Sequence, residues 1–235
     1  MNILLQGAMN EEIDFFLEYY KPYEERIIQG FCFYVADFKG NKVIISKTEK
    51  GIINATMATT IALMEFSIDL VINQGCAGAH TEHLKIGDII LGEKAVYIND
   101  FKAMQKSIGE GSNSLDWIPN KKRCYETYST KLYLEIAKNV KFDSNVKVGI
   151  IGSGDMHSRE YDRIMYLNKL FGEDCEDMES AAALRVCEIF GVDKLALRVI
   201  SNNDLLLTEF NKTTCKALQK FVIDLINDII EKISR

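Results

Sequence analysis

The chain has 235 residues, 47% of them hydrophobic, which is enough for one α/β domain with a substantial buried core. Its net charge of −6 comes from 28 basic and 34 acidic residues, interleaved along the sequence without the basic patch that a nucleic-acid-binding protein carries. No apolar run is long enough to cross a bilayer, and the first residues lack a signal-peptide pattern, so we expect a cytoplasmic protein that binds neither nucleic acids nor membranes.

Short apolar runs alternate with stretches of helical periodicity along the chain. Strands are predicted at 2–6, 31–38, 42–48, 70–75, 88–98, 146–151 and 194–201. Helices are predicted at 11–19, 53–66, 129–139, 179–190 and 212–233. This alternation predicts a mostly parallel sheet with helices on both faces, to which the pair 31–38 and 42–48 adds an antiparallel hairpin. The least periodic segment, 101–124, is a candidate lid or interface element. With no linker or repeat, we expect a single domain over 1–235.

The six cysteines are scattered, with no C-x-x-C pair and no clustering with the three histidines. A structural zinc site is therefore not expected. Free thiols are the default in a chain without a secretion signal, so we expect all six to be unpaired. They are Cys32, Cys76, Cys124, Cys175, Cys187 and Cys215.

Two of the predicted strand ends carry small or acidic residues, and strand ends are where α/β proteins bind ligands. The segment GAMNEE, residues 7–12, places Glu11 and Glu12 in the first turn of a helix, where acidic residues also complement the helix dipole. The segment NQGCAGAH, residues 73–80, has small residues that leave room for a ligand beside the backbone. A tight turn packed against a helix also explains this second segment.

Two further strand ends are more informative. The segment GSGDMHS, residues 152–158, lacks the third glycine of a dinucleotide fingerprint, and the chain has no G-K-[ST], so a nicotinamide cofactor and a P-loop are rejected. In the segment 175–190, Asp177 suits a helix N-cap and Glu179 the first turn. A glutamate beside Met178 also suits a sugar, because the carboxylate accepts hydrogen bonds from vicinal hydroxyls while the thioether packs on the ring.

In order and spacing these segments resemble the nucleoside phosphorylase and nucleosidase superfamily, and most of all the 5′-methylthioadenosine/S-adenosylhomocysteine nucleosidases. The matching pieces are IxxxGAMxEE at 3–12, VINxGxAG at 71–78, KIGDII at 85–90, GD at 154–155, DMESAA at 177–182 and RVIS at 198–201. The resemblance implies a three-layer αβα sandwich with a central mixed sheet, and a homodimer. It also implies hydrolysis of the bond between purine N9 and ribose C1′, with no metal or organic cofactor.

The resemblance also assigns roles. Glu12 would orient or deprotonate the attacking water, and Glu179 would accept hydrogen bonds from the 2′- and 3′-hydroxyls, with Met178 against the sugar and Met9 nearby. Cys76 stands where the family has a small hydroxyl residue; a nucleophilic role is disfavoured because no histidine is evidently paired with it. The other substrate-binding residues implied are Ala77, Gly78, Asp177 and Ser201.

The chain departs from the family where the catalytic aspartate at the base is expected, because Ser201 is followed by Asn202. An amide cannot deliver a proton to purine N7, but it can offer its NH₂ to an O6 carbonyl. Asn202 therefore favours a 6-oxopurine nucleoside such as inosine, guanosine or futalosine. Two alternatives remain open: Asp204 supplies the acid, or the protein binds nucleosides with impaired catalysis.

Three other positions bear on the substrate. His157 replaces the aromatic residue that commonly stacks on the purine. Lys50 replaces an apolar residue near the 5′ group; it is either a solvated loop lysine or a partner for an anionic 5′ substituent. Phe210 is expected to close the 5′ pocket. A phosphorylase remains an alternative, but its phosphate-binding arginines are missing from QGAMNEE and LVINQGCAG.

Overall fold

The computed structural model describes residues 1–120 and 125–233. The strands are β1 (Asn2–Gly7), β2 (Glu24–Ile28), β3 (Phe31–Phe38), β4 (Asn41–Lys47), β5 (Leu70–Ala79), β6 (Ile89–Tyr97), β7 (Phe101–Lys102), β8 (Ile118–Pro119), β9 (Glu126–Tyr128), β10 (Val146–Ser153), β11 (Cys175–Asp177) and β12 (Asp193–Asn203). The helices are α1 (Asn10–Tyr20), α2 (Ile52–Glu65), α3 (Lys131–Ala137), α4 (Tyr161–Phe171), α5 (Ser180–Phe190) and α6 (Thr214–Ile233), with short 3₁₀ turns η1 (Ser114–Asp116) and η2 (Asp204–Leu206).

The strands form one central mixed sheet. Its order is β11-β10-β6-β12-β5-β1-β4-β3-β2, and β9 pairs with β6. The pairs β5–β1, β1–β4 and β12–β5 are parallel, so β1, β5 and β12 end at the same edge of the sheet. The antiparallel hairpin of β3 and β4 confirms the prediction from the sequence.

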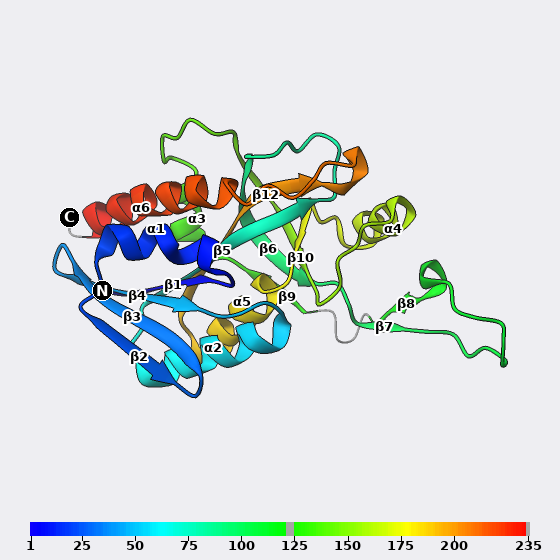
Figure 1. Cartoon of the computed structure of the whole chain (residues 1–235), viewed down its shortest axis with the longest axis horizontal. Coiled ribbons are helices and arrows are strands. Elements are labelled where there is room, and N and C mark those ends of the chain that lie inside the picture. The colour runs from blue at the N-terminus through cyan, green and yellow to red at the C-terminus, as the bar shows by residue number, and fades with distance from the viewer. Residues whose placement is uncertain (121–124, 234–235) are drawn as a thin grey trace.

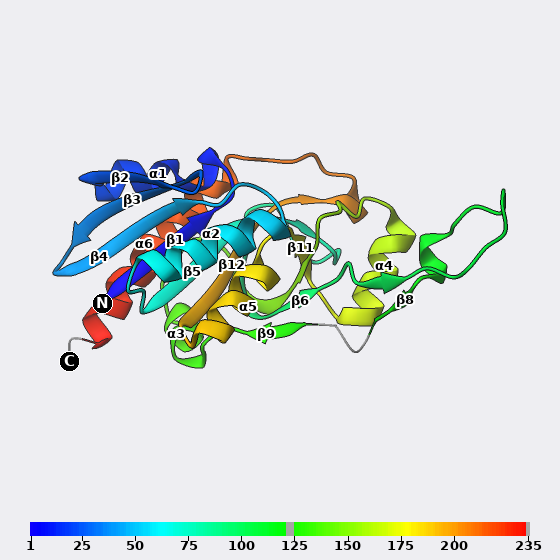
Figure 2. The ribbon, with the colours of Figure 1, turned by 90° about the horizontal axis from the view of Figure 1, so that it is seen from below.

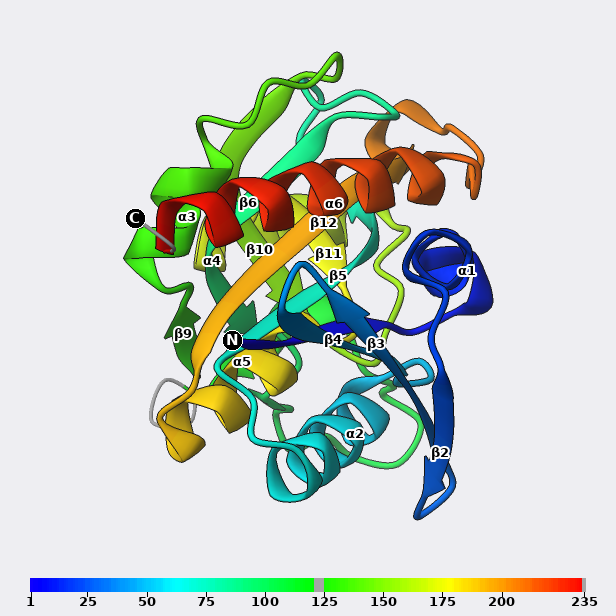
Figure 3. The same cartoon turned by 90° about the vertical axis from the view of Figure 1, so that its left-hand side faces the viewer.

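Helices cover both faces of this sheet. Figure 1 and Figure 3 show α1, α3 and α6 on one face and α2 and α5 on the other. The fold is thus the nucleoside phosphorylase-like αβα sandwich that the sequence predicted. Among the described residues, no helix combines the length and apolar character needed to cross a membrane.

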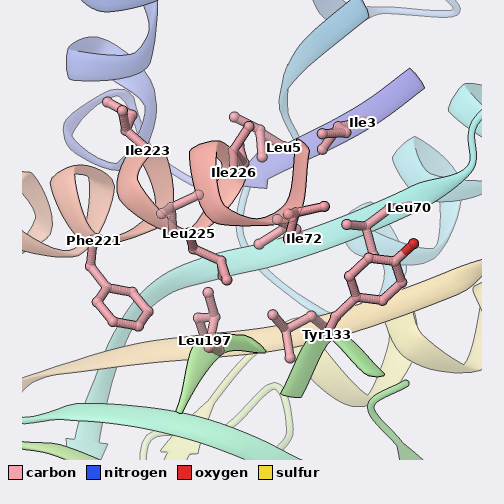
Figure 4. Packing of buried hydrophobic residues seen from close by; sticks show 14 of the residues in the cluster. Ile3, Leu5, Leu70, Ile72, Tyr133, Leu197, Phe221, Ile223, Leu225 and Ile226 are labelled. Atoms are coloured by element: carbon pink, nitrogen blue, oxygen red, sulfur yellow. The ribbon is translucent and has the colours of Figure 1, made fainter. Parts of the chain in front are cut away.

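The largest buried cluster lies between the sheet and α6. Figure 4 shows strand residues such as Ile3, Ile72 and Leu197 facing Phe221 and Leu225 of α6. The buried apolar residues of α6 recur at spacings of three and four, so one stripe of the helix faces the sheet. This packing fixes α1 and α6 above the strand ends that carry the candidate site.

Several elements differ from the sequence prediction. Strand β5 continues past the predicted end at 75 to Ala79, and β2, α4 and β11 were not predicted. Within the segment 101–124, residues 101–120 contain the short β7–β8 hairpin and η1, and Figure 2 shows this arm extending from the body. Residues 121–124 lie outside the described residues.

Candidate active site

A cavity of about 520 Å³ opens where β1, β5 and β12 end. Its lining includes every residue that the sequence analysis placed in the site, so side chains from distant segments come together at one cavity. These residues are Met9, Glu12, Lys50, Cys76, Ala77, Gly78, His157, Asp177, Met178, Glu179, Ser201, Asn202, Asp204 and Phe210. The lining also includes Ala8, Met156, Ser158, Arg159, Glu176 and Glu209, which the sequence analysis did not single out.

Glu12 is an acid of the cavity whose two carboxylate oxygens are both held by backbone hydrogen bonds. It lies at the third position of α1 and bends back over the helix start, where Oε2 accepts hydrogen bonds from the backbone N–H of Ala8 (2.6 Å) and Met9 (3.1 Å). Its Oε1 accepts a third from Cys76 N–H at 2.8 Å. A Cβ at Gly75 would lie 2.5 Å from Oε1, so this close approach of β5 requires a glycine.

Glu12 is only 4% exposed, and this burial raises the pKa of its carboxyl group although the backbone hydrogen bonds and Arg198 oppose the shift. A carboxylate with a raised pKa is a stronger base than one in water. It is also held in one orientation at the cavity wall. These two properties suit a group that must orient or deprotonate a water molecule.

Glu179 forms a second acidic centre. Its Oε1 accepts a hydrogen bond from Gly51 N–H at 3.0 Å, and Arg198 lies 3.9 Å from its Oε2. Burial and then the negative charge of Asp177 raise the pKa of Glu179 to about 7. Met178 lies next to it in the lining, so the pairing of carboxylate and thioether inferred from the sequence is present on one wall.

The helix start next to Glu179 differs from the prediction. Helix α5 begins at Ser180, and the N-cap position is Glu179 rather than Asp177. Asp177 instead ends β11, and its Oδ2 accepts a hydrogen bond from Ser180 N–H at 3.1 Å. Asp177 therefore accepts a hydrogen bond from the first turn of α5 while lying before the N-cap position. Its side chain also pairs with Arg198 of β12.

Arg198 is the main functional residue that the sequence analysis missed. It is 1% exposed, pairs with Asp177, and donates to the carbonyl oxygen of Asn73 at 3.1 Å. A signal was available, since an arginine within an apolar strand run must find a charged partner when it is buried. Arg198 supports Asp177 and Glu179 from behind and does not itself line the cavity.

Asn202 takes part in a chain of hydrogen bonds at another wall. Its amide nitrogen donates to Asp204 Oδ2 at 2.9 Å, and its amide oxygen accepts from the Ser201 hydroxyl at 2.9 Å. Arg159 Nε donates to Asp204 Oδ1 at 3.1 Å. Because Asp204 Oδ2 accepts one N–H of the Asn202 amide, the NH₂ of Asn202 faces Asp204 and its second N–H is left for a ligand.

The loop before α4 is anchored through Glu176. Ser158 donates from its backbone N–H (3.0 Å) and its hydroxyl (3.2 Å) to this carboxylate, which holds exposed His157 at the cavity. Behind Glu176, the buried His80 ring bridges Glu176 (3.0 Å) and Glu173 (3.1 Å). Burial alone would lower the pKa of His80, but these two carboxylates raise it to about 9.

The expectation of unpaired cysteines is wrong for two of the six. Cys76 and Cys215 form a disulfide between β5 and the first turn of α6, with their Cα atoms 6.3 Å apart. The pairing joins residues 139 positions apart in the sequence, so no local pattern indicates it. Cys32, Cys175 and Cys187 are free, as predicted. Cys124 lies outside the described residues.

Lys50 and Phe210 lie at the exposed rim of the cavity. Lys50 also borders a shallow neighbouring pocket whose lining includes Lys47 and Glu49. Those two residues form an ion pair at 2.8 Å, whereas Lys50 is not part of that pair. The cations among the described lining residues are therefore Lys50 and Arg159, in addition to the imidazole of His157.

Comparison with known proteins agrees with this architecture. The family model described as the phosphorylase superfamily matches residues 2–231, so the chain belongs to that superfamily. A 5′-methylthioadenosine/S-adenosylhomocysteine nucleosidase of a Geobacillus species is 29% identical, covering 97% of this chain and 99% of its own length. The aminodeoxyfutalosine nucleosidase of Helicobacter pylori is 28% identical, covering 93% of this chain and 96% of its own length.

A solved structure extends the likeness. An aspartate-to-asparagine mutant of Helicobacter pylori MTAN, with 5′-methylthioadenosine in the active site, superposes with a TM-score of 0.82. It is 26% identical, and the match covers 97% of this chain and 98% of that one.

Proposed function

We propose that this chain is a hydrolytic purine nucleosidase that cleaves the N-ribosidic bond of a purine nucleoside, of the methylthioadenosine/adenosylhomocysteine nucleosidase type. The observation that carries the proposal is the buried Glu12 carboxylate, held by three backbone N–H groups at the wall of a cavity that also contains Met178 and Glu179. Full-length nucleosidase relatives support the reaction class.

Different residues of the cavity stabilise different parts of an oxocarbenium-like transition state. Glu12 orients a water molecule toward C1′ and takes its proton, and its negative charge stabilises the positive charge that develops on the ribose. Glu179 accepts hydrogen bonds from the ribose hydroxyls, and Met178 and Met9 pack against the sugar. Asn202 contacts the departing base.

Water is proposed as the acceptor rather than phosphate. A phosphorylase surrounds its phosphate with cationic side chains, usually arginines. Among the described residues that line this cavity, the lysine and arginine side chains are Lys50 at the rim and Arg159, which is paired with Asp204. Neither is hydrogen-bonded to Glu12, whose own charge would repel a phosphate dianion.

The first test compares Glu12→Gln with Glu11→Gln. Both changes remove one carboxylate from the first turn of α1, but Glu11 points to solvent and does not line the main cavity. We expect Glu12→Gln to lower free-base release by roughly a hundredfold or more, because a positioned base contributes about that much. Binding of the nucleoside should remain measurable, and Glu11→Gln should keep normal activity. Full activity in Glu12→Gln would remove Glu12 from the mechanism.

A second candidate substrate class, the 6-oxopurine nucleosides, is favoured by the hydrogen bonds of Asn202. Because its NH₂ faces Asp204, the group presents a donor N–H to the base. A donor matches the O6 carbonyl of hypoxanthine or guanine, whereas it faces a second donor at the 6-amino group of adenine. A mismatch of this kind costs about 1–3 kcal/mol per unsatisfied buried group.

Base release from a panel of nucleosides in phosphate-free buffer distinguishes these classes. The panel holds methylthioadenosine, adenosylhomocysteine, adenosine, inosine, guanosine and futalosine. Adenine released fastest supports the methylthioadenosine type, and hypoxanthine or guanine released fastest supports a 6-oxopurine nucleosidase. Release that requires phosphate identifies a phosphorylase. Tight binding without release identifies a nucleoside-binding protein.

We also propose that the chain acts as one domain, in the cytoplasm, and as a homodimer. The β7–β8 arm supports the dimer, because it carries exposed Met104 (51%), Ile108 (107%) and Ile118 (53%) on a segment that extends from the body (Figure 2). Light scattering after size exclusion should give twice the mass of the chain. A monomer at micromolar concentration would contradict this.

A further inference from the structure

We propose that Cys76 and Cys215 are a reversible thiol–disulfide pair that fastens the cover segment, residues 207–213, over the active-site cavity. The cover segment carries Glu209 and Phe210, which both line the cavity, and it leads directly into α6. Cys215 is the second residue of α6, and Cys76 lines the cavity from β5. The disulfide therefore joins the end of the cover segment to the cavity wall.

The noncovalent contacts of the cover segment lead mainly to a different strand. Asn211 donates from its backbone N–H to Ser201 O at 2.8 Å, and Thr208 donates in the same way to Asn203 O at 3.1 Å. Both contacts reach β12, and an exposed ion pair from Lys212 to Glu11 (3.6 Å) adds little. Among the described residues, the disulfide is the covalent attachment of the end of this segment to β5, in addition to the packing of α6 on the sheet. Breaking this bond should loosen the cover without unfolding the sheet.

The same bond lies against the proposed base. Cys76 donates its backbone N–H to Glu12, and the two sulfurs and a Glu12 oxygen lie within 4.8 Å of one another. On the α6 side, the carbonyl oxygen of Cys215 accepts a hydrogen bond from Gln219, whose side chain also accepts the Phe15 N–H of α1 at 2.9 Å. Hydrogen bonds thus link the disulfide to Glu12 directly through Cys76, and to α1, the helix that carries Glu12, through Gln219.

Exposure determines how the pair exchanges. Cys76 is partly exposed in the cavity, whereas Cys215 is 2% exposed. A small disulfide such as oxidised glutathione reacts first with the Cys76 thiolate, forming a mixed disulfide and releasing one glutathione. The Cys215 thiolate then attacks the Cys76 sulfur and releases the second glutathione. Two protein thiols lose two protons and two electrons, and one glutathione disulfide becomes two thiols.

The test equilibrates the full chain in glutathione buffers that run from fully reduced to fully oxidised. EDTA is present because two thiolates beside a carboxylate are potential metal ligands. Trapped samples are mapped for the Cys76–Cys215 peptide. Brief trypsin treatment reports on the cover segment, because Lys212 is exposed within it. Cleavage after Lys141, an exposed lysine in another loop, is the internal reference.

We expect the rate of cleavage after Lys212 to rise roughly tenfold on reduction, because loss of the cross-link lets the cover segment open locally more often. The midpoint of this rise should coincide with that of the loss of the cross-linked peptide. Cleavage after Lys141 should not change. Cys215→Ser should be cleaved quickly in every buffer, and Cys32→Ser, which changes a free thiol, should respond like the wild type. Neither readout depends on nucleosidase activity.

Two results would overturn the proposal. One is the absence of the Cys76–Cys215 peptide at every glutathione ratio, including the case in which glutathione stays attached to Cys76. The other is an equal rate of Lys212 cleavage with and without the cross-link. The wild-type titration decides both, so the conclusion does not depend on how well the variant folds.

Discussion

Replacing Asn202 with aspartate should convert one wall of the cavity into a carboxyl pair that shares a proton. The amide nitrogen of Asn202 lies 2.9 Å from Asp204 Oδ2, so the new carboxyl group would lie beside an existing one. Two unit charges at that separation repel by about 6 kcal/mol at an effective dielectric constant of about 20. This repulsion raises the pKa of one member of the new pair, and the charge of Arg159 opposes part of the increase.

A carboxylic acid that is still protonated near neutral pH can donate to purine N7, which the amide cannot do. We therefore expect Asn202→Asp to release adenine from methylthioadenosine roughly a hundredfold faster than the wild type, within the range of general acid catalysis. Hypoxanthine release from inosine should fall, because the new carboxyl group is either ionised or shares its proton with Asp204. It therefore no longer presents a fixed N–H donor to the O6 carbonyl.

The assay is the initial rate of base release with both nucleosides, with Asn202→Ala as the matched control. Alanine removes the amide without adding an acid, so it should lower both rates. Unchanged adenine release in Asn202→Asp, or an equal gain in Asn202→Ala, would refute the reasoning and would leave Asp204 as the group that protonates the base.

Two further predictions come from the titrating groups. The acidic limb of the pH profile of kcat/KM should have an apparent pKa above the ordinary carboxyl range, since the pKa values of Glu12 and Glu179 are both raised. Glu179→Gln should lower that apparent pKa, and an unchanged value would contradict the assignment. The His80 pKa of about 9, against 6.5 unfolded, gives stability that is complete below pH 6.5 and disappears as pH rises through 9. In urea unfolding at pH 6 and pH 9, His80→Gln should remove this difference in the free energy of unfolding, which is up to about 3 kcal/mol in the wild type. The same difference in the variant as in the wild type would contradict the prediction.

Much of the architecture could be predicted from the sequence because long apolar runs determine the buried strands. The ends of β3 were predicted to the residue, and those of α1 and α6 to within two. Strand β11 was missed because its three residues, Cys175–Asp177, include two acids, and its pairing depends on tertiary contacts with β10 and β5. Helix α4 was missed because polar residues interrupt its apolar stripe.

The site was predictable to the degree that strand ends converge. Glu12, Asn202 and Glu179 lie far apart in the sequence. They meet because β1 and β12 end at one edge of the sheet, where β11 pairs with the last residues of β5 and leads into α5. Partners that depend on three-dimensional position were not predictable. The Cys76–Cys215 disulfide has no local signal, and the ring of His80 lies between its two carboxylates only after β5 and β11 pair.

The side of the cavity that holds Glu12 and the side that carries Ser158 and Asn202 are fixed by different hydrogen bonds, which has a consequence for how such enzymes diversify. Glu12 is held by backbone groups of the β1–α1 turn and of β5. Ser158 instead depends on Glu176, and Asn202 on Asp204 with Arg159. Exchanging residues of the second set leaves the hydrogen bonds of Glu12 intact. A few substitutions can therefore change the specificity for the purine base while bond cleavage at the ribose is preserved. A library of variants confined to residues 156–159 and 202–204 should contain such changes in specificity.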